Sequence, residues 1–157
     1  MTKDIERYMR EAIQLSIDNI DNNGGPFGAV IVKGGKIIAK GVNRVTMDVD
    51  PTAHAEVNAI REASKVLGTF DLEGCEIYSS CEPCPMCLGA IYWAHLDKLY
   101  FANTKQDAKE IEFDDSFIYE EIEQPLADRK IPTKQILREE ALEAFNKWKE
   151  KEDKIEY

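Results

Sequence analysis

Hydrophobic residues near the start of the chain recur at intervals of three and four. They are Ile5, Tyr8, Met9, Ala12, Ile13, Ile17 and Ile20. Side chains at this spacing share one face of an α-helix, so we expect a helix that buries these residues as a single stripe. The Asn-Asn-Gly-Gly segment at 22–25, with Pro26 directly behind it, predicts the end of that helix.

Two short apolar runs follow the predicted helix. They occupy residues 27–32 and 37–39, and the segment Lys-Gly-Gly-Lys at 33–36 separates them. Adjacent glycines supply the positive φ angles that a tight hairpin turn requires. The pattern therefore predicts a β-hairpin.

The middle of the chain alternates helical and extended patterns. Asp50-Pro51 favours a helix start, and apolar positions then step along one face as far as Gly68. We expect a strand at 76–79, a mostly apolar helix opened by Pro85, and a strand at 98–101. Strand, helix and strand over about thirty residues form a parallel crossover unit. We therefore predict an α/β fold of three layers, α/β/α, with a mixed central sheet of about five strands.

The pattern becomes weaker beyond Thr104. Acidic residues and an aromatic cluster at 107–123 predict short helical turns. Residues 137–151 predict a charged helix with Leu142, Phe145 and Trp148 on one side. We interpret residues 1–157 as a single domain, with 137–157 as its C-terminal helix and tail.

Composition restricts the class of partner. The chain has 157 residues, with 20 Lys plus Arg against 30 Asp plus Glu, and 20 − 30 gives a net charge of −10. Nucleic-acid binding draws much of its affinity from Lys and Arg that displace counterions, so we expect a small-molecule partner and no nucleic acid. No stretch approaches the ~20 apolar residues of a membrane span, so we expect no membrane partner. The first residues are charged throughout, and four cysteines in a chain without an export signal predict reduced thiols in the cytoplasm.

Two fragments carry candidate metal chemistry. His54-Ala55-Glu56 begins one predicted helix, and Pro83-Cys84-Pro85-Met86-Cys87 begins the next. One imidazole and two thiolates are ligands that Zn²⁺ prefers, and three protein ligands leave a fourth position for water, as in catalytic sites. If Cys84 caps its helix and Pro85 is the first helical residue, both sulfurs lie at the positive helix end, which favours thiolates.

His54 and Glu56 pose a geometric problem. Residues two apart on a regular helix point in roughly opposite directions, so both can face one ion only if the helix begins at about His54. His54 would then be a ligand, and Glu56 would reach the bound water. Alone, Glu56 would be interpreted as a solvated helix residue; the neighbouring His54 favours a functional role.

Cys81 leaves an alternative open. With His54, Cys84 and Cys87 it would complete a closed structural site of three thiolates and one imidazole. Pro83 and Pro85 break any continuous helical face, so we favour a packing role for Cys81 and likewise for Cys75. We assign His95 a surface or capping position and no chemistry.

The order His-x-Glu and then Pro-Cys-x-x-Cys resembles the signature of zinc-dependent cytidine deaminase-like enzymes. The resemblance extends from about Ile5 to Ala102. It implies one Zn²⁺ per subunit, which would lower the pKa of bound water from ~15.7 toward about 7. The resulting hydroxide would attack an aminated ring carbon of a heterocycle. Glu56 would move the proton from water to a ring nitrogen and then assist the departure of ammonia.

Further segments suggest the substrate. Residues 50–56 are similar in tRNA adenosine deaminases and guanine deaminases and do not distinguish them. Residues 25–32, 81–94 and 113–119, with the closing Glu156-Tyr157, resemble the short bacterial guanine deaminases nearly end to end. This resemblance implies hydrolysis of guanine to xanthine and ammonia. Guanosine, cytosine, another aminated heterocycle and tRNA adenosine stay open as substrates, and a zinc-stabilised binding module without turnover is the rival from another class.

The same resemblance implies roles for substrate-binding residues. Asn43 would donate to the guanine carbonyl, Phe27 and Trp93 would form pocket walls, Asp115 would recognise the base and help move protons, and Tyr157 would close the site. A carboxylate and an amide complement the donors and acceptor on the edge of guanine. Alternatively, Asn43 terminates a strand, Phe27 and Trp93 belong to the core, and Asp115 is a turn residue.

The resemblance also implies an assembly. In these enzymes the C-terminal segment crosses to a second subunit and covers its active site, so we expect a homodimer with exchanged tails. Phe145 and Trp148 support this, because they need burial that the polar segment before them does not supply. The alternative packs the helix on its own subunit.

Overall fold

The computed structural model describes residues 2–157, and the chain divides into two compact units. The first unit ends at Asp115. Its elements are α1 (Thr2–Asp21), β1 (Gly28–Lys33), β2 (Lys36–Val42), α2 (Ala55–Leu67), β3 (Cys75–Cys81), α3 (Pro85–Trp93), β4 (Lys98–Asn103) and α4 (Lys105–Glu110). The second unit, Ser116–Tyr157, contains α5 (Ser116–Glu123), the 3₁₀ helix η1 (Leu126–Asp128) and α6 (Arg138–Glu150).

The first unit is built on a mixed sheet with strand order β2-β1-β3-β4. β1 runs antiparallel to both β2 and β3, and β3 runs parallel to β4. The predicted hairpin and the predicted parallel crossover are both confirmed. The sheet has four strands in the described chain rather than about five, since only the four segments with a strand pattern form strands and the chain after Asn103 forms the predicted short helical segments.

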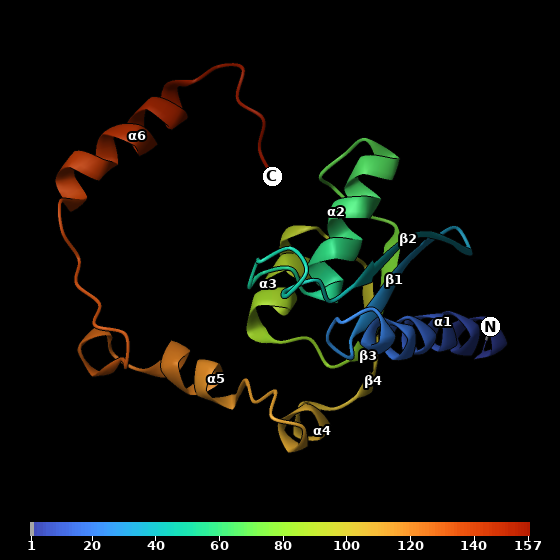
Figure 1. Ribbon diagram of the computed structural model, residues 1–157. Helices are drawn as coiled ribbons and strands as arrows, with labels where there is room; N and C mark the ends of the chain where they lie inside the picture. Colours follow the sequence, from blue (N-terminus) through green and yellow to red (C-terminus); the bar gives the residue numbers. More distant parts are fainter. Residues whose placement is uncertain (1) are drawn as a thin grey trace. The chain divides into compact units, whose positions relative to one another are not determined.

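Helices cover both faces of this sheet, which confirms the α/β/α class (Figure 1). Alternate strand residues point to opposite faces. Val30, Val32 and Tyr78 pack against Tyr8 and Ala12 of α1. On the other face, a second cluster combines strand residues with α2 and α3, including Ala29, Ile31, Ile77, Ala55, Ala59 and Ile91.

The buried face of α1 differs from the predicted stripe. Ile17 and Ile20 are exposed, at 52% and 55%, whereas Ala12 and Asn19 are buried. Positions four apart advance by 400° on a helix, so a stripe drawn through every fourth residue drifts around the helix by about 40° at each step. The prediction was therefore wrong for the last turns of α1, where Asn19 faces inward.

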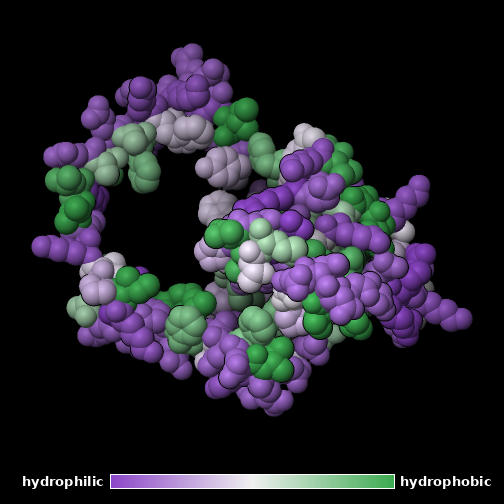
Figure 2. All heavy atoms as spheres, viewed as in Figure 1, coloured by the Kyte–Doolittle hydropathy of each residue, from purple (hydrophilic) through white to green (hydrophobic). Residues whose placement is uncertain are grey.

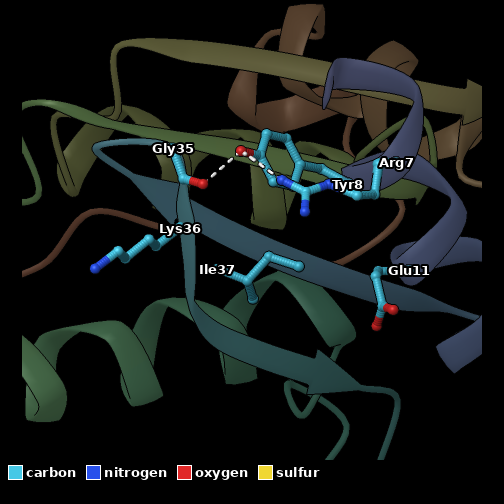
Figure 3. Close-up of a pocket in the computed structure, with 6 residues that line it drawn as sticks. All are labelled: Arg7, Tyr8, Glu11, Gly35, Lys36 and Ile37. Carbon is cyan, nitrogen blue, oxygen red and sulfur yellow. Dashed lines mark hydrogen bonds between the residues drawn. The ribbon is translucent and has the colours of Figure 1, made fainter. Parts of the chain in front are cut away.

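The turn of the hairpin is formed as predicted, with Gly34 and Gly35 at φ 56° and 76°. The Tyr8 hydroxyl donates a hydrogen bond of 2.6 Å to the carbonyl of Gly35 and so ties α1 to the turn. Figure 3 shows a pocket at this junction, lined by residues of α1 and the hairpin. None of its lining residues carries the candidate metal chemistry.

The second unit has no buried residue in α5, η1 or α6. α6 confirms the predicted C-terminal helix, with Leu142 half-buried, Phe145 69% exposed and Trp148 43% exposed. Figure 2 shows apolar and polar residues on different sides of this helix. None of the helices in residues 2–157 is long and apolar enough to cross a lipid bilayer.

Candidate active site

The helix starts of α2 and α3 bring the predicted ligands together. His54 caps α2 with extended backbone angles (φ −74°, ψ 157°), and Cys84 caps α3 in the same conformation (φ −67°, ψ 169°) with Pro85 as the first helical residue. Both predicted caps are therefore confirmed. The extended backbone at His54 turns its imidazole away from the regular helical direction, toward the sulfurs of α3.

Three ligand atoms meet at this point. His54 Nδ1 lies 3.6 Å from Cys84 Sγ and 3.4 Å from Cys87 Sγ, and all three atoms lie within 4.8 Å of one another. Cys87 is fully buried, while His54 and Cys84 are partly accessible. One nitrogen and two sulfurs at these separations fit the ligand set of a tetrahedral zinc ion that keeps one corner for water.

The pKa values of the two cysteines are shifted in opposite directions. A hydrogen bond from Cys87, followed by the contact with His54, lowers the pKa of Cys84 to about 4 although burial opposes this. The pKa of Cys87 is raised, first by its hydrogen bond to Cys84 and then by burial. The hydrogen bond to Cys84 raises the pKa of His54. A donor set in which at least one thiol ionises readily suits a dication.

Glu56 lies beside this cluster in a nearly dry position. Its side chain is 6% exposed, and burial raises the pKa of its carboxyl, with a hydrogen bond from Cys87 acting in the opposite direction. Glu56 also interacts electrostatically with His54 and Cys84. Glu56 therefore lies beside the same sulfur pair as His54, and its reach to a bound water stays a prediction.

Cys81 is separate from the three-ligand group in the described chain. Its thiol lies 3.8 Å from the carbonyl of Thr104, and burial is the main reason why its pKa is raised to about 11. Cys75 is fully buried in the core cluster. His95 is exposed, with Nδ1 3.3 Å from Asp71 Oδ1. All three positions match the packing or surface roles expected for them.

Asn43 follows β2 directly and is 8% exposed. Its backbone N–H donates to Phe27 O at 3.2 Å, and its side-chain Oδ1 accepts from Val45 N–H at 3.2 Å. Nδ2 has no hydrogen-bond partner among residues 2–157. Asn43 therefore ends the strand and also keeps a donor available.

The two predicted wall residues have different surroundings. Phe27 is half-buried and packs edge-on against Phe113, with ring centroids 5.0 Å apart and planes at 89°. Trp93 is 69% exposed at the end of α3, which is inconsistent with a plain core position.

Asp115 ends the first unit, and Tyr157 belongs to the second. Burial raises the pKa of Asp115, and a hydrogen bond to its own backbone opposes this. Repulsion from Cys84 also raises the pKa, so the carboxyl of Asp115 interacts electrostatically with a candidate zinc ligand. The closing role of Tyr157 stays a prediction.

Two residues near the site were missed by the sequence analysis. Asn19 of α1 and Asn58 of α2 both hydrogen-bond to the backbone around Asn43. Asn19 could have been noticed as an amide on the inward face of α1, but nothing in the local sequence indicates which carbonyls it binds.

A family comparison agrees with this geometry. Residues 2–103 match the model of the cytidine and deoxycytidylate deaminase zinc-binding region. The chain belongs to this family. It is a zinc-dependent deaminase that uses one Zn²⁺, as the His/Cys/Cys group also indicates.

Several proteins and solved structures are similar to this family member. The guanine deaminase of Bacillus subtilis is 52% identical over 153 residues, which cover 97% of this chain and 98% of the relative. Its X-ray structure superposes with a TM-score of 0.94 over the same shares of the two chains. The tRNA-specific adenosine deaminase of Bacillus subtilis is 44% identical over 101 residues, 64% of this chain and 62% of the relative. The crystal structure of NE0047 with 2,6-diaminopurine is 37% identical, with a TM-score of 0.68, over 71% of this chain and 62% of that one.

Proposed function

We propose that this deaminase hydrolyses guanine to xanthine and ammonia. The observation that carries the proposal is the match to a guanine deaminase over 153 of 157 residues, which includes nearly all of the second unit. The tRNA-specific relative accounts for only 101 residues. The net charge of −10 also favours a small base over tRNA.

His54, Cys84 and Cys87 would hold the zinc ion, and Glu56 would be the general acid and base. Bound zinc supplies Lewis acidity that makes water a nucleophile at neutral pH. Glu56 would take one proton from the attacking water and pass it to a ring nitrogen of the base. It would then take the proton of the hydroxyl group left on the ring carbon and pass it to the leaving amino group. A C–O bond forms, a C–N bond breaks, and ammonia leaves, so one water is consumed for each xanthine. The raised pKa of Glu56 suits a group that must both accept and return a proton.

Side chains around this centre provide the proposed recognition of guanine. The free Nδ2 of Asn43 is a donor for the guanine carbonyl, and Asp115 accepts from ring N–H groups and assists proton movement. Phe27 and Trp93 supply the aromatic walls, and Tyr157 closes the site. Polar groups of this kind reject bases that leave them unpaired.

The decisive experiment is ultraviolet detection of xanthine formed from guanine by purified zinc-loaded protein, beside guanosine, cytosine, cytidine and tRNA. We expect guanine to be strongly preferred. A large preference for tRNA adenosine would overturn the proposal, as would the absence of any ammonia release.

The catalytic role of Glu56 is tested by Glu56→Gln. We expect at least about a hundredfold loss of rate, because general acid and base catalysis contributes that much or more. Zinc content, measured by elemental analysis, should stay at one per chain. Glu62→Gln, on the exposed side of α2, is the matched control and should keep full activity. An unchanged rate in Glu56→Gln would favour a binding module.

We further propose that the protein is a cytoplasmic homodimer in which residues 137–157 are exchanged between subunits. The absence of buried residues in α5, η1 and α6 supports a second copy as the cover for Phe145 and Trp148. Sedimentation analysis should give a dimer, and Phe145→Asp should shift it toward the monomer. A monomeric parent protein would contradict the exchange.

A further inference from the structure

Two carboxamide groups hold the backbone at Asn43 from opposite faces of the sheet. The first belongs to Asn19 of α1, which is 3% exposed. Its Nδ2 donates to Gly25 O at 2.8 Å and to Asn43 O at 2.9 Å. Both N–H groups of this amide are used, and together they tie Asn43 to the loop that precedes Phe27.

The second carboxamide belongs to Asn58 of α2. Its Nδ2 donates to Val42 O at 2.8 Å and to Ala53 O at 3.3 Å. The backbone N–H of Asn58 donates to His54 O at 3.0 Å. One residue therefore connects the end of β2, next to Asn43, with the residue that precedes the metal ligand His54.

Close packing makes these connections stiff. A Cβ atom on Gly24 would overlap the amide of Asn19, and one on Gly25 would lie 3.1 Å from Asn43 Cγ. The Gly24-Gly25 loop therefore packs tightly against the side chains of Asn19 and Asn43. Movement of Asn43 would require Asn19, the loop and Asn58 to move with it.

The orientation of the Asn43 side chain depends on this framework. Val45 N–H engages Oδ1, which leaves Nδ2 as the atom that a base can meet. If the backbone at 42–43 loosened, the amide could rotate and present its oxygen instead. An acceptor on the substrate would then lose its partner.

We propose that Asn19 and Asn58 are positioning residues that aim Nδ2 of Asn43 and so set the selectivity for a base with a carbonyl group. The inference rests on the proposed function, since guanine supplies that carbonyl. It extends the site to two residues that contact neither zinc nor substrate.

The test compares guanine with 2-aminopurine, which carries the same amino group and lacks the carbonyl. We expect Asn58→Ala and Asn19→Ala to lower the ratio of kcat/KM for guanine to that for 2-aminopurine by about tenfold, the value of one good hydrogen bond. KM for guanine should change more than kcat, and zinc content should stay at one per chain. Lys65→Ala and Asn22→Ala, exposed residues of α2 and of the turn after α1, are controls whose ratio should stay within about twofold.

A double-mutant cycle separates positioning from general destabilisation. In the Asn43→Ala background, Asn58→Ala should lower the ratio no further, because the group it aims is gone. Additive losses, or an unchanged ratio in Asn58→Ala alone, would overturn the inference.

If Asn19→Ala does not fold, the variant of the half-buried Asn58 still tests the inference. A parent protein inactive on guanine would refute the proposed function as well, whereas an active parent with an unchanged variant ratio refutes the positioning role alone.

Discussion

Glu56 is a carboxyl group placed where its charged form is poorly hydrated. Burial of a charge opposes folding, and the hydrogen bond from Cys87 offsets only part of that cost. Such a position is useful for proton transfer and unfavourable for stability. We infer that selection for turnover, rather than for folding, maintains an acid at the start of α2.

The contrast between Cys84 and Cys81 gives a prediction at the same scale. Cys84→Ala should lose zinc and activity, because it removes one of three ligand atoms that lie within 4.8 Å of one another. Cys81→Ala should retain zinc, since its thiol faces the carbonyl of Thr104. Metal analysis after gel filtration distinguishes the two variants. Loss of zinc from Cys81→Ala would favour the alternative of a closed site with four protein ligands.

Single residues also show what sequence can predict at the site. His54, Cys84 and Cys87 were predicted from their residue types and from their positions at two helix starts, whereas the sequence left a fourth ligand, Cys81, open until the structure separated it from the group. The partners of Asn19 and Asn58 are backbone carbonyls far away in the chain, at sequence separations of 24 and 16. Such bonds depend on how the sheet and helices pack and leave no local pattern.

At the scale of elements, α2 and α3 share an unusual beginning. Neither His54 nor Cys84 makes a side-chain hydrogen bond to its own helix start. Residues such as Ser or Asp would stabilise these helix ends better, by about 1 kcal/mol. α2 and α3 therefore lack the stabilisation of a side-chain cap, and the side chains of His54 and Cys84 are instead able to face one ion.

The contact between β2 and α2 sets the position of that helix start. A Cβ atom on Gly41 would overlap Ala55 O and lie 2.5 Å from Ala59 N. Gly41→Ala should therefore destabilise the fold by about 1–3 kcal/mol, measured by denaturant unfolding. Gly89→Ala is the matched control: nothing lies within 4 Å of its Cβ position in α3, so stability should rise by about 0.5–1 kcal/mol. Equal effects at the two positions would contradict this packing.

The capping box of α4 predicts a pH dependence. Asp107 accepts from the backbone N–H of Thr104 at 2.8 Å and from its hydroxyl at 2.9 Å, and these bonds lower the pKa of Asp107. Because the folded pKa lies below the unfolded one, this stabilisation is complete above the unfolded value and is lost as pH falls through the folded value. Asp107→Ala should lower the melting temperature at pH 7, and the deficit should shrink below about pH 4, near the unfolded pKa of Asp. A deficit independent of pH would exclude the ionised cap.

For the molecule as a whole, sequence patterns predicted the first unit better than the second. The hairpin, the crossover and both ligand-bearing helices have strong local signals and were found where expected. A fifth strand is absent from residues 2–157, and the four strands present are the four segments that the sequence patterns had located. The surface that packs on the apolar side of α6 could not be predicted from the sequence, since the proposed surface belongs to a second copy of the chain.

The tail gives a prediction at this scale. Deleting the last few residues through Tyr157 should lower turnover about tenfold or more, because a residue that closes the site also orients the substrate. Zinc content should be unaffected, since the ligands lie in the first unit. Glu152→Gln, an exposed change in the same tail, should behave like the parent protein. Unchanged steady-state kinetics in the truncated protein would reject a lid.

Neither of the two tryptophans of this chain is buried in the sheet core, since Trp93 and Trp148 are 69% and 43% exposed. Intrinsic fluorescence therefore observes the two surfaces on which the proposals depend, one at the end of α3 and one on α6. The fluorescence of Trp93 would report on ligand binding, and the fluorescence of Trp148 would report on self-association. Single-tryptophan variants would make the two signals separable without any attached dye.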